Sequence, residues 1–159
     1  NLVVGALPLA SRLGAYIRGE KGLTYGIYSY FDNHMYGPGL WNVQATVNPK
    51  LAGQLAEAVK DIVALVRKKG VTRKELEDMR TGEIGNFQVG LISNSSLAEM
   101  LHFIVEQDMG LDYLDNYPAL LNKVTLKQVN EAVVKYFNVD GASLVIAGPK
   151  PDLILNAGE

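Results

Sequence analysis

Residues 24–47 read TYGIYSYFDNHMYGPGLWNVQATV, and this stretch decides the fold class. Its first part, residues 24–31, is rich in Tyr and contains Ile, which predicts a β-strand. Its last part, residues 40–47, alternates apolar and polar side chains, as is typical of a strand with one buried face. The segment between them, residues 32–39, contains an Asp, an Asn, two Gly and a Pro, which predicts a turn. Together these signals predict an antiparallel hairpin.

Helical patterns flank the predicted hairpin on both sides. Residues 1–7 predict the tail of an apolar helix, and residues 11–19 predict a short amphipathic helix that Ser11 can cap. After the hairpin, Pro49 predicts the start of a long helix, which Gly70 ends. Helical spacing predicts that its inward side chains are Leu51, Leu55, Val59, Ile62, Val63 and Val66.

Three motifs with capping-box spacing predict the starts of further helices. They are Thr72 with Glu75, Ser96 with Glu99, and Thr125 with Gln128. Gly82, Gly85 and Gly90 predict a break near residues 90–95. The expected helices cover residues 96–108 and 112–122, and a last one starts at residue 125 with Val129, Val133, Tyr136 and Phe137 facing inward.

The last predicted element is a strand at residues 142–147. This run, ASLVIA, is short, contains β-branched residues and lies between two glycines, which predicts a buried strand. The element order is then helices, hairpin, helices and strand. It predicts an α+β fold in which helices pack on one face of an antiparallel sheet. Residues 1–159 are expected to form a single domain.

Composition excludes several classes of function. The chain has no cysteine, which excludes disulfides and cysteine-ligated metal centres. Its formal net charge is −2, and it has no basic block, so nucleic acid is not an expected partner. No apolar run reaches the roughly 20 residues that span a bilayer. The start at Asn1, without an initiator Met or a basic region, predicts a cut inside a larger polypeptide.

The two histidines, His34 and His102, do not predict a metal site. A zinc peptidase helix needs two His that reach one ion and a Glu as base. His34 falls in the predicted turn, whereas His102 falls in a predicted helix with Glu106 one turn later. Such a surface pair is common, and zinc takes three or four ligands. With no Cys nucleophile and no Ser–His–Asp order, the sequence also predicts no catalytic residue in this chain.

Arg18 and Tyr25 are the candidate binding residues. Arg18 is expected to end a helix and Tyr25 to begin a strand, with a tight turn at Gly22 between them. Arginine presents a rigid fork of donors and tyrosine one phenolic donor, a set that can hold peptide carbonyls or an oxyanion. Physical chemistry alone favours a plainer interpretation, a solvated cation at a helix end and an ordinary strand aromatic.

The segment around these two residues resembles the C-terminal domain of the pitrilysin/insulinase family of zinc metallopeptidases, the inverzincins. That family shows Ser-Arg-Leu, then Leu/Ile-Arg, then Gly-Leu-x-Tyr, with six residues between Arg and Tyr. Here SRL stands at residues 11–13, and Arg18 and Tyr25 have the family spacing. Shorter matches follow in order: TVNP at 46–49, GVTRKEL at 70–76, VTLKQV at 124–129, KYFNVD at 135–140 and LVIAGP at 144–149.

The resemblance implies that the chain has the fold of one half of a LuxS/pitrilysin-like metallopeptidase. In that family two homologous halves close around an unfolded peptide, and the N-terminal half carries the H-x-x-E-H motif that binds zinc and activates water. The C-terminal half supplies the Arg–Tyr pair. By this resemblance Arg18 holds the substrate backbone, and Tyr25 donates a hydrogen bond to the substrate carbonyl or its tetrahedral intermediate.

The sequence departs from the family pattern in two ways. H-x-x-E-H is absent, so the chain alone is expected to be inactive, with zinc held by the other half. The first strand and most of the helix expected before Ser11 are also missing, so the sheet is expected to lack a strand or to borrow one from another chain.

The leading hypothesis is the substrate-binding C-terminal domain of a zinc endopeptidase that cleaves extended peptides. Its expected partners are the peptide and an H-x-x-E-H domain or companion subunit, and a homo-oligomer is left open. One alternative is a metal-free subunit of a two-subunit peptidase. The other is a non-catalytic structural subunit of the same fold, since fold alone does not fix function.

Overall fold

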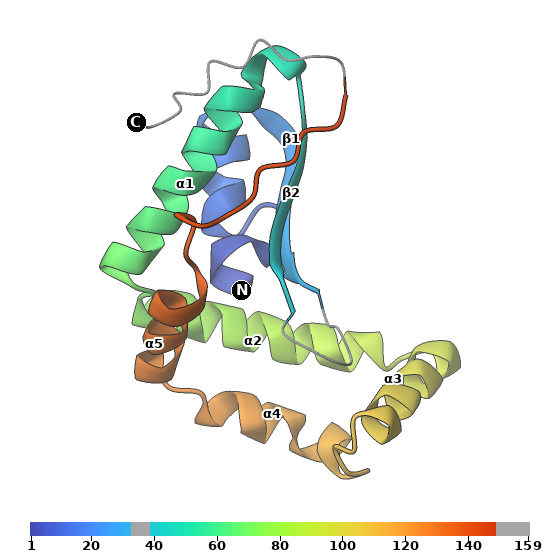
Figure 1. Ribbon diagram of the computed structural model, residues 1–159. Helices are drawn as coiled ribbons and strands as arrows, with labels where there is room; N and C mark the ends of the chain where they lie inside the picture. Colours follow the sequence, from blue (N-terminus) through green and yellow to red (C-terminus); the bar gives the residue numbers. More distant parts are fainter. Residues whose placement is uncertain (33–38, 149–159) are drawn as a thin grey trace. The chain divides into compact units, whose positions relative to one another are not determined.

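The computed structural model describes residues 1–32 and 39–148. Their contacts form two compact units, which are described separately (Figure 1). The first unit contains residues 1–71 and the described residues from 130 onward, and the second contains Thr72–Val129. Across the described ranges, no helix is both long enough and apolar enough to cross a membrane. The single-domain organisation stays a prediction.

The hairpin of the first unit is confirmed. Strand β1 (Thr24–Phe31) pairs in antiparallel fashion with strand β2 (Trp41–Val47), and Ile27 lies opposite Ala45. The backbone N–H of Asp32 donates to the carbonyl of Leu40 over 2.8 Å, which continues the pairing past the strand ends. Most of the expected turn, including His34, lies outside the described residues.

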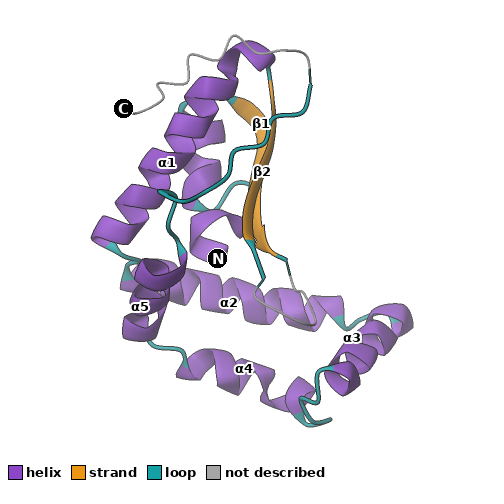
Figure 2. Ribbon diagram, viewed as in Figure 1, coloured by secondary structure: helices purple, strands orange, loops and turns teal. Residues whose placement is uncertain are grey.

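One side of this hairpin is buried against helical segments. Segments η1 (Leu2–Ala6) and η2 (Gly14–Glu20) pack against β1, and helix α1 (Ala52–Lys69), preceded by the short turn η3 (Pro49–Leu51), packs against η2. Figure 2 shows these helices on one side of the two strands. The fully buried side chains of this unit are Val4, Ser11, Leu13, Ile17, Ile27, Val63 and Val66. This part of the chain is therefore a helix-covered hairpin.

Helix α1 follows the predicted pattern in part. The expected start at Pro49 and end at Gly70 are confirmed: the Asn48 side chain accepts from the N–H of Lys50 over 3.0 Å, and Gly70 ends the helix at a φ of 72°. Ile62, Val63 and Val66 are buried. The other three expected positions, Leu51, Leu55 and Val59, are only half-buried.

The second unit is helical and contains α2 (Arg73–Gly90), α3 (Asn94–Glu106), α4 (Tyr113–Lys123) and the first part of α5 (Leu126–Tyr136). The capping box at Thr72 is confirmed, because its hydroxyl accepts from the N–H of Glu75 while the Glu75 carboxylate accepts from the N–H of Thr72. Thr125 and Gln128 form the same reciprocal pair. The expected break after residue 90 is confirmed as well.

Two helix predictions were wrong in detail. Ser93, not Ser96, caps α3, because Ser93 has an extended backbone and its hydroxyl accepts from the N–H of Ser96 over 3.0 Å. Tyr136 is 57% exposed rather than inward. Val133 and Phe137 are buried and lie four residues apart on one side of the helix, whereas Tyr136 is about 100° away from Phe137.

The predicted strand at residues 142–147 was also wrong. The segment is not paired in a sheet, and Val145 is 85% exposed. A strand needs a neighbour whose N–H and C=O groups bond with its own. The sheet formed by the described residues has two strands, β1 and β2, and neither of them pairs with this segment. An apolar, β-branched run therefore did not suffice to make a strand here.

The close approach of Gly14 to the chain before it gives a test of this packing. A Cβ at residue 14 would collide with the backbone carbonyl of Pro8, whereas a Cβ at Gly19 in the same helix would meet nothing within 4 Å. Gly14→Ala is therefore expected to lower the free energy of unfolding by about 1–3 kcal/mol. Gly19→Ala, the matched control, is expected to leave it unchanged or raise it by up to about 1 kcal/mol. Urea denaturation of both variants measures the difference, and equal effects would contradict the packing.

Candidate functional site

The structure brings Arg18 and Tyr25 together. The guanidinium carbon of Arg18 lies 4.5 Å from the centre of the Tyr25 ring. At this distance the cation is attracted to the electron-rich ring face. Arg18 is half-buried, while Tyr25 is 85% exposed and reaches into solvent. Two residues that the sequence placed on different elements therefore form one surface feature of the first unit.

The turn after η2 sets the separation of the two residues. The N–H of Lys21 donates to the carbonyl of Tyr16 over 2.9 Å, and the N–H of Leu23 donates to the carbonyl of Ile17 over 3.0 Å. Gly22 lies between them with a φ of 60°, a left-handed conformation that glycine adopts without strain. The tight turn expected at Gly22 is thus confirmed, and it leads the chain from the helix directly into β1.

A β-bulge then aims Tyr25 out of the hairpin. Thr24 pairs with Val47 and Gly26 pairs with Thr46, so Tyr25 is an extra residue without a partner on β2. The Thr24 hydroxyl accepts from the N–H of Gly26 and donates to the carbonyl of Thr46, which holds the bulge. Bulges commonly re-aim a side chain. Sequence reasoning missed this bulge, although a lone glycine inside a predicted strand is its usual signal.

The polar atoms of this pair are available to a ligand. Within residues 1–32 and 39–148, neither the Arg18 guanidinium nor the Tyr25 hydroxyl has a hydrogen bond or ion pair to another side chain. The guanidinium presents several N–H donors in one plane, and the phenol presents one O–H donor. Carbonyl oxygens and oxyanions are the acceptors that such a set binds best.

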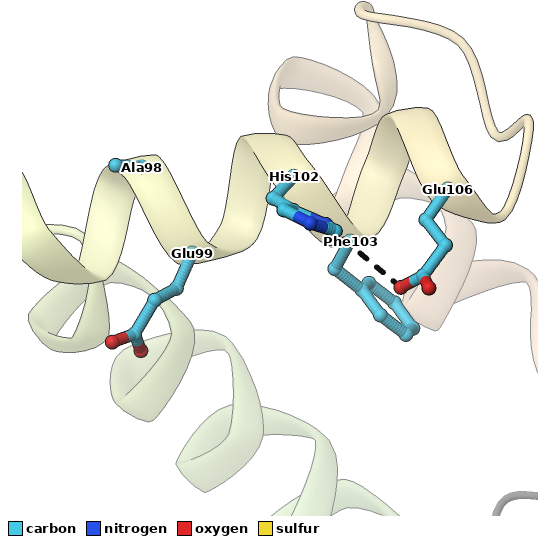
Figure 3. Close-up of a pocket in the computed structure, with 5 residues that line it drawn as sticks. All are labelled: Ala98, Glu99, His102, Phe103 and Glu106. Atoms are coloured by element: carbon cyan, nitrogen blue, oxygen red, sulfur yellow. Dashed lines mark ion pairs between the residues drawn. The ribbon is translucent and has the colours of Figure 1, made fainter.

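His102, the histidine among the described residues, does not lie in a metal-binding cluster. His34 lies outside the described residues. On α3, the Nδ1 atom of His102 lies 3.8 Å from the Oε2 atom of Glu106, and Figure 3 shows Glu99 extending apart from that pair. In the described part of the chain, no cluster of three or more His, Cys, Asp or Glu residues could hold a metal ion. These residues therefore do not fit a zinc site.

The second unit has an aromatic cluster that sequence reasoning missed. The rings of Phe87 and Tyr117 stack with centres 4.0 Å apart, and the Tyr117 hydroxyl donates to the Oε1 atom of Glu83 over 3.1 Å. Partial burial and the neighbouring Glu83 charge raise the pKa of Tyr117 to about 12. The sequence signal for this cluster was weak: Tyr113 and Tyr117 lie four residues apart on α4, and α2 offers Phe87.

Comparison with known proteins identifies the family. Residues 4–83, which include Arg18 and Tyr25, match the family model described as the peptidase M16 inactive domain. The chain belongs to this family. M16 is the pitrilysin-type family of zinc proteases, so the resemblance found from the sequence is confirmed.

Individual relatives support the same assignment. The chain is 28% identical over 150 residues to a Bacillus subtilis (strain 168) protein named uncharacterized zinc protease YmxG, a match that covers 92% of this chain and 36% of that protein. It is 28% identical to a crystal structure of the peptidase M16 inactive domain from Pseudomonas fluorescens, with a TM-score of 0.76 and coverage of 88% of this chain and 33% of that one. The chain thus spans about a third of the length of these relatives.

A more distant structure shows the fold alone. The inactive peptidase domain of a putative zinc protease from Bordetella parapertussis is 16% identical, with a TM-score of 0.67 and coverage of 86% of this chain and 73% of that one. The α+β fold, with its two-stranded antiparallel sheet and its helices, is therefore that of M16 inactive domains. The chain is a non-catalytic domain homologous to zinc proteases.

The Tyr117–Glu83 contact makes a prediction about pH. Burial, followed by the Glu83 charge, raises the pKa of Tyr117 on folding from an ordinary value of about 10 to about 12. The stability that neutral Tyr117 contributes is therefore full below pH 10 and is lost between about pH 10 and 12. Glu83→Gln is expected to move this pKa down towards its ordinary value while keeping an acceptor for the hydroxyl. Nuclear magnetic resonance of ring-labelled tyrosine measures the titration, and an unshifted Tyr117 in the unsubstituted chain would contradict the contact.

Proposed function

We propose that this chain is the substrate-binding C-terminal half of a zinc endopeptidase that cleaves extended peptides. The single observation that carries the proposal is the stacking of Arg18 on Tyr25 with their polar atoms available to a ligand. The spacing of the pair matches the inverzincin pattern, and the pair lies inside the matched residues 4–83.

The geometry suggests a separate role in substrate binding for each of the two side chains. The contact of the Arg18 guanidinium with the Tyr25 ring limits the rotation of both side chains, so less rotational freedom is lost when the guanidinium donors bind carbonyl oxygens of a peptide backbone. The Tyr25 hydroxyl, aimed outward by the bulge, donates to the carbonyl oxygen of the scissile bond. A donor placed there gains strength as negative charge develops on that oxygen during hydrolysis.

The zinc and the H-x-x-E-H motif belong to another half of the parent enzyme in this proposal. That half is either an N-terminal domain of the same polypeptide or a companion subunit. Three observations support the assignment. The sequence contains no H-x-x-E-H motif, the B. subtilis relative is named an uncharacterized zinc protease, and the match covers only 36% of that relative. The parent is then a hydrolase, while this chain positions the substrate.

The proposal extends to the sheet. A two-stranded sheet is marginally stable alone, and the apolar residues 144–146 of the same unit are exposed and belong to no strand. We therefore propose that the complete sheet contains a further strand. Its source is another part of the parent polypeptide, a companion subunit or a second copy of this chain.

Substitution of Tyr25 tests the function. In the parent enzyme, Tyr25→Phe is expected to lower kcat for peptide hydrolysis by about 100- to 1,000-fold, because it removes one donor to the developing oxyanion. The free energy of unfolding should change little, since Tyr25 is 85% exposed. Tyr28→Phe is the matched control, because Tyr28 is an exposed tyrosine of the same strand.

The outcomes of this test separate the alternatives. An unchanged rate for Tyr25→Phe would remove the proposed role of Tyr25. A parent protein that neither cleaves nor binds extended peptides would instead favour a structural subunit of the same fold. Equal losses in Tyr25→Phe and Tyr28→Phe would show that the effect comes from the strand as a whole rather than from the pair.

A further inference from the structure

The second unit contains a hollow that is separate from Arg18 and Tyr25. It has a volume of about 470 Å³ and is open to solvent, with walls from α2, α3 and α4. Its main lining side chains are Glu83, Phe87, Glu99, Phe103, Tyr113 and Tyr117. Pockets that bind small groups are typically of this order of size, and they combine apolar walls with a few polar atoms.

Three aromatic rings form a connected wall of this hollow. The Phe87 and Tyr117 rings are stacked at 26°, and the Tyr113 ring centre lies 5.6 Å from that of Tyr117. All three side chains are half-buried, so they are held by packing and still border the open space. The faces of such rings carry partial negative charge, which attracts cations.

Two carboxylates border the same space. Glu83 is fixed there by the hydrogen bond from the Tyr117 hydroxyl, and Glu99 projects from α3 (Figure 3). The described lining residues include no Lys or Arg, so the charge of the hollow is negative. A neutral apolar ligand would displace water from both carboxylates and could not replace the hydrogen bonds that this water makes to them. Its binding would therefore be unfavourable. A cation with an apolar stem can pack against the aromatic rings and pair with the carboxylates.

We propose that this hollow binds a basic side chain, arginine or lysine, of an extended peptide. The methylene stem would pack on Phe87 and Phe103, and the charged end would lie between Glu83 and Glu99 over the tyrosine rings. Arginine fits best because its flat guanidinium both stacks on aromatic faces and pairs with carboxylates. The inference rests on the proposed function for the source of the side chain, since an extended peptide is the proposed substrate. The inference adds to that function a preference for substrate peptides that contain basic residues.

A titration with two short peptides tests the site. The probes are acetyl-Gly-Arg-Gly-amide and its counterpart with Gln in place of Arg, added to the full 159-residue chain and followed by nuclear magnetic resonance of the backbone amides. The arginine peptide is expected to bind with a dissociation constant on the order of 1 mM and to shift signals of α2, α3 and α4 around Phe87, Phe103 and Tyr113. The glutamine peptide should bind at least about fivefold more weakly.

Charge-neutral variants locate the binding. Glu83→Gln and Glu99→Gln are each expected to weaken binding of the arginine peptide by about threefold, and Glu83→Gln keeps an acceptor for Tyr117. Glu77→Gln is the matched control, because Glu77 is an exposed carboxylate of α2 that does not line the hollow. Unaltered amide spectra before titration show that each variant is folded.

Two results would overturn the proposal. One is equal affinity for the two peptides, and the other is a loss of affinity in Glu77→Gln as large as in Glu83→Gln. The readout uses neither peptide cleavage nor the residues Arg18 and Tyr25. A negative titration would therefore overturn only the basic-side-chain site and would not bear on the function proposed for Arg18 and Tyr25. An unchanged hydrolysis rate in Tyr25→Phe would overturn the role of Tyr25 but would not contradict a positive titration.

Discussion

The hydrogen bond from the N–H of Leu23 to the carbonyl of Ile17 is the constraint on which the candidate site depends. It forms because Gly22 takes a left-handed conformation, and it turns the end of η2 back so that β1 begins at once. Ile17 is fully buried on one side of this turn, while Arg18, the next residue, faces outward enough to stack on Tyr25. A longer connection would leave the same two side chains free to move apart, with more freedom to lose on binding.

The hairpin holds Tyr25, the second residue of the candidate site, in position. The ladder of β1 and β2 is anchored by the Asn1 side chain, which bonds to Ser29 and to the Trp41 indole, and by Phe137, whose ring lies 4.6 Å from that of Trp41. The bulge at Tyr25 interrupts the ladder only at its first residues. Because the bulge turns the Tyr25 side chain outward at the end of a paired strand, the strand can hold the Tyr25 hydroxyl donor at a fixed point.

Local signals in the sequence predicted most of the fold, and non-local features were missed. Neighbours in the chain set the helix start at Pro49, the caps at Thr72 and Thr125, the helix end at Gly70 and the alternation of β2. These features could therefore be predicted from the sequence. The segment 142–147 was mispredicted because strand formation depends on a distant partner. The Arg18–Tyr25 spacing was readable, but their stacking required the bulge, and the hollow around Tyr117 required three helices to meet.

A double-mutant cycle in the parent enzyme tests the central claim, that Arg18 and Tyr25 act on a peptide as one unit. The measured quantity is kcat/KM for peptide hydrolysis by Arg18→Ala, Tyr25→Phe and the double variant. Because each side chain orients the other, the double variant is expected to lose less than the sum of the two single losses, with a coupling energy of about 1 kcal/mol or more. Losses that add to within about 0.5 kcal/mol would contradict it, since independent residues behave in that way.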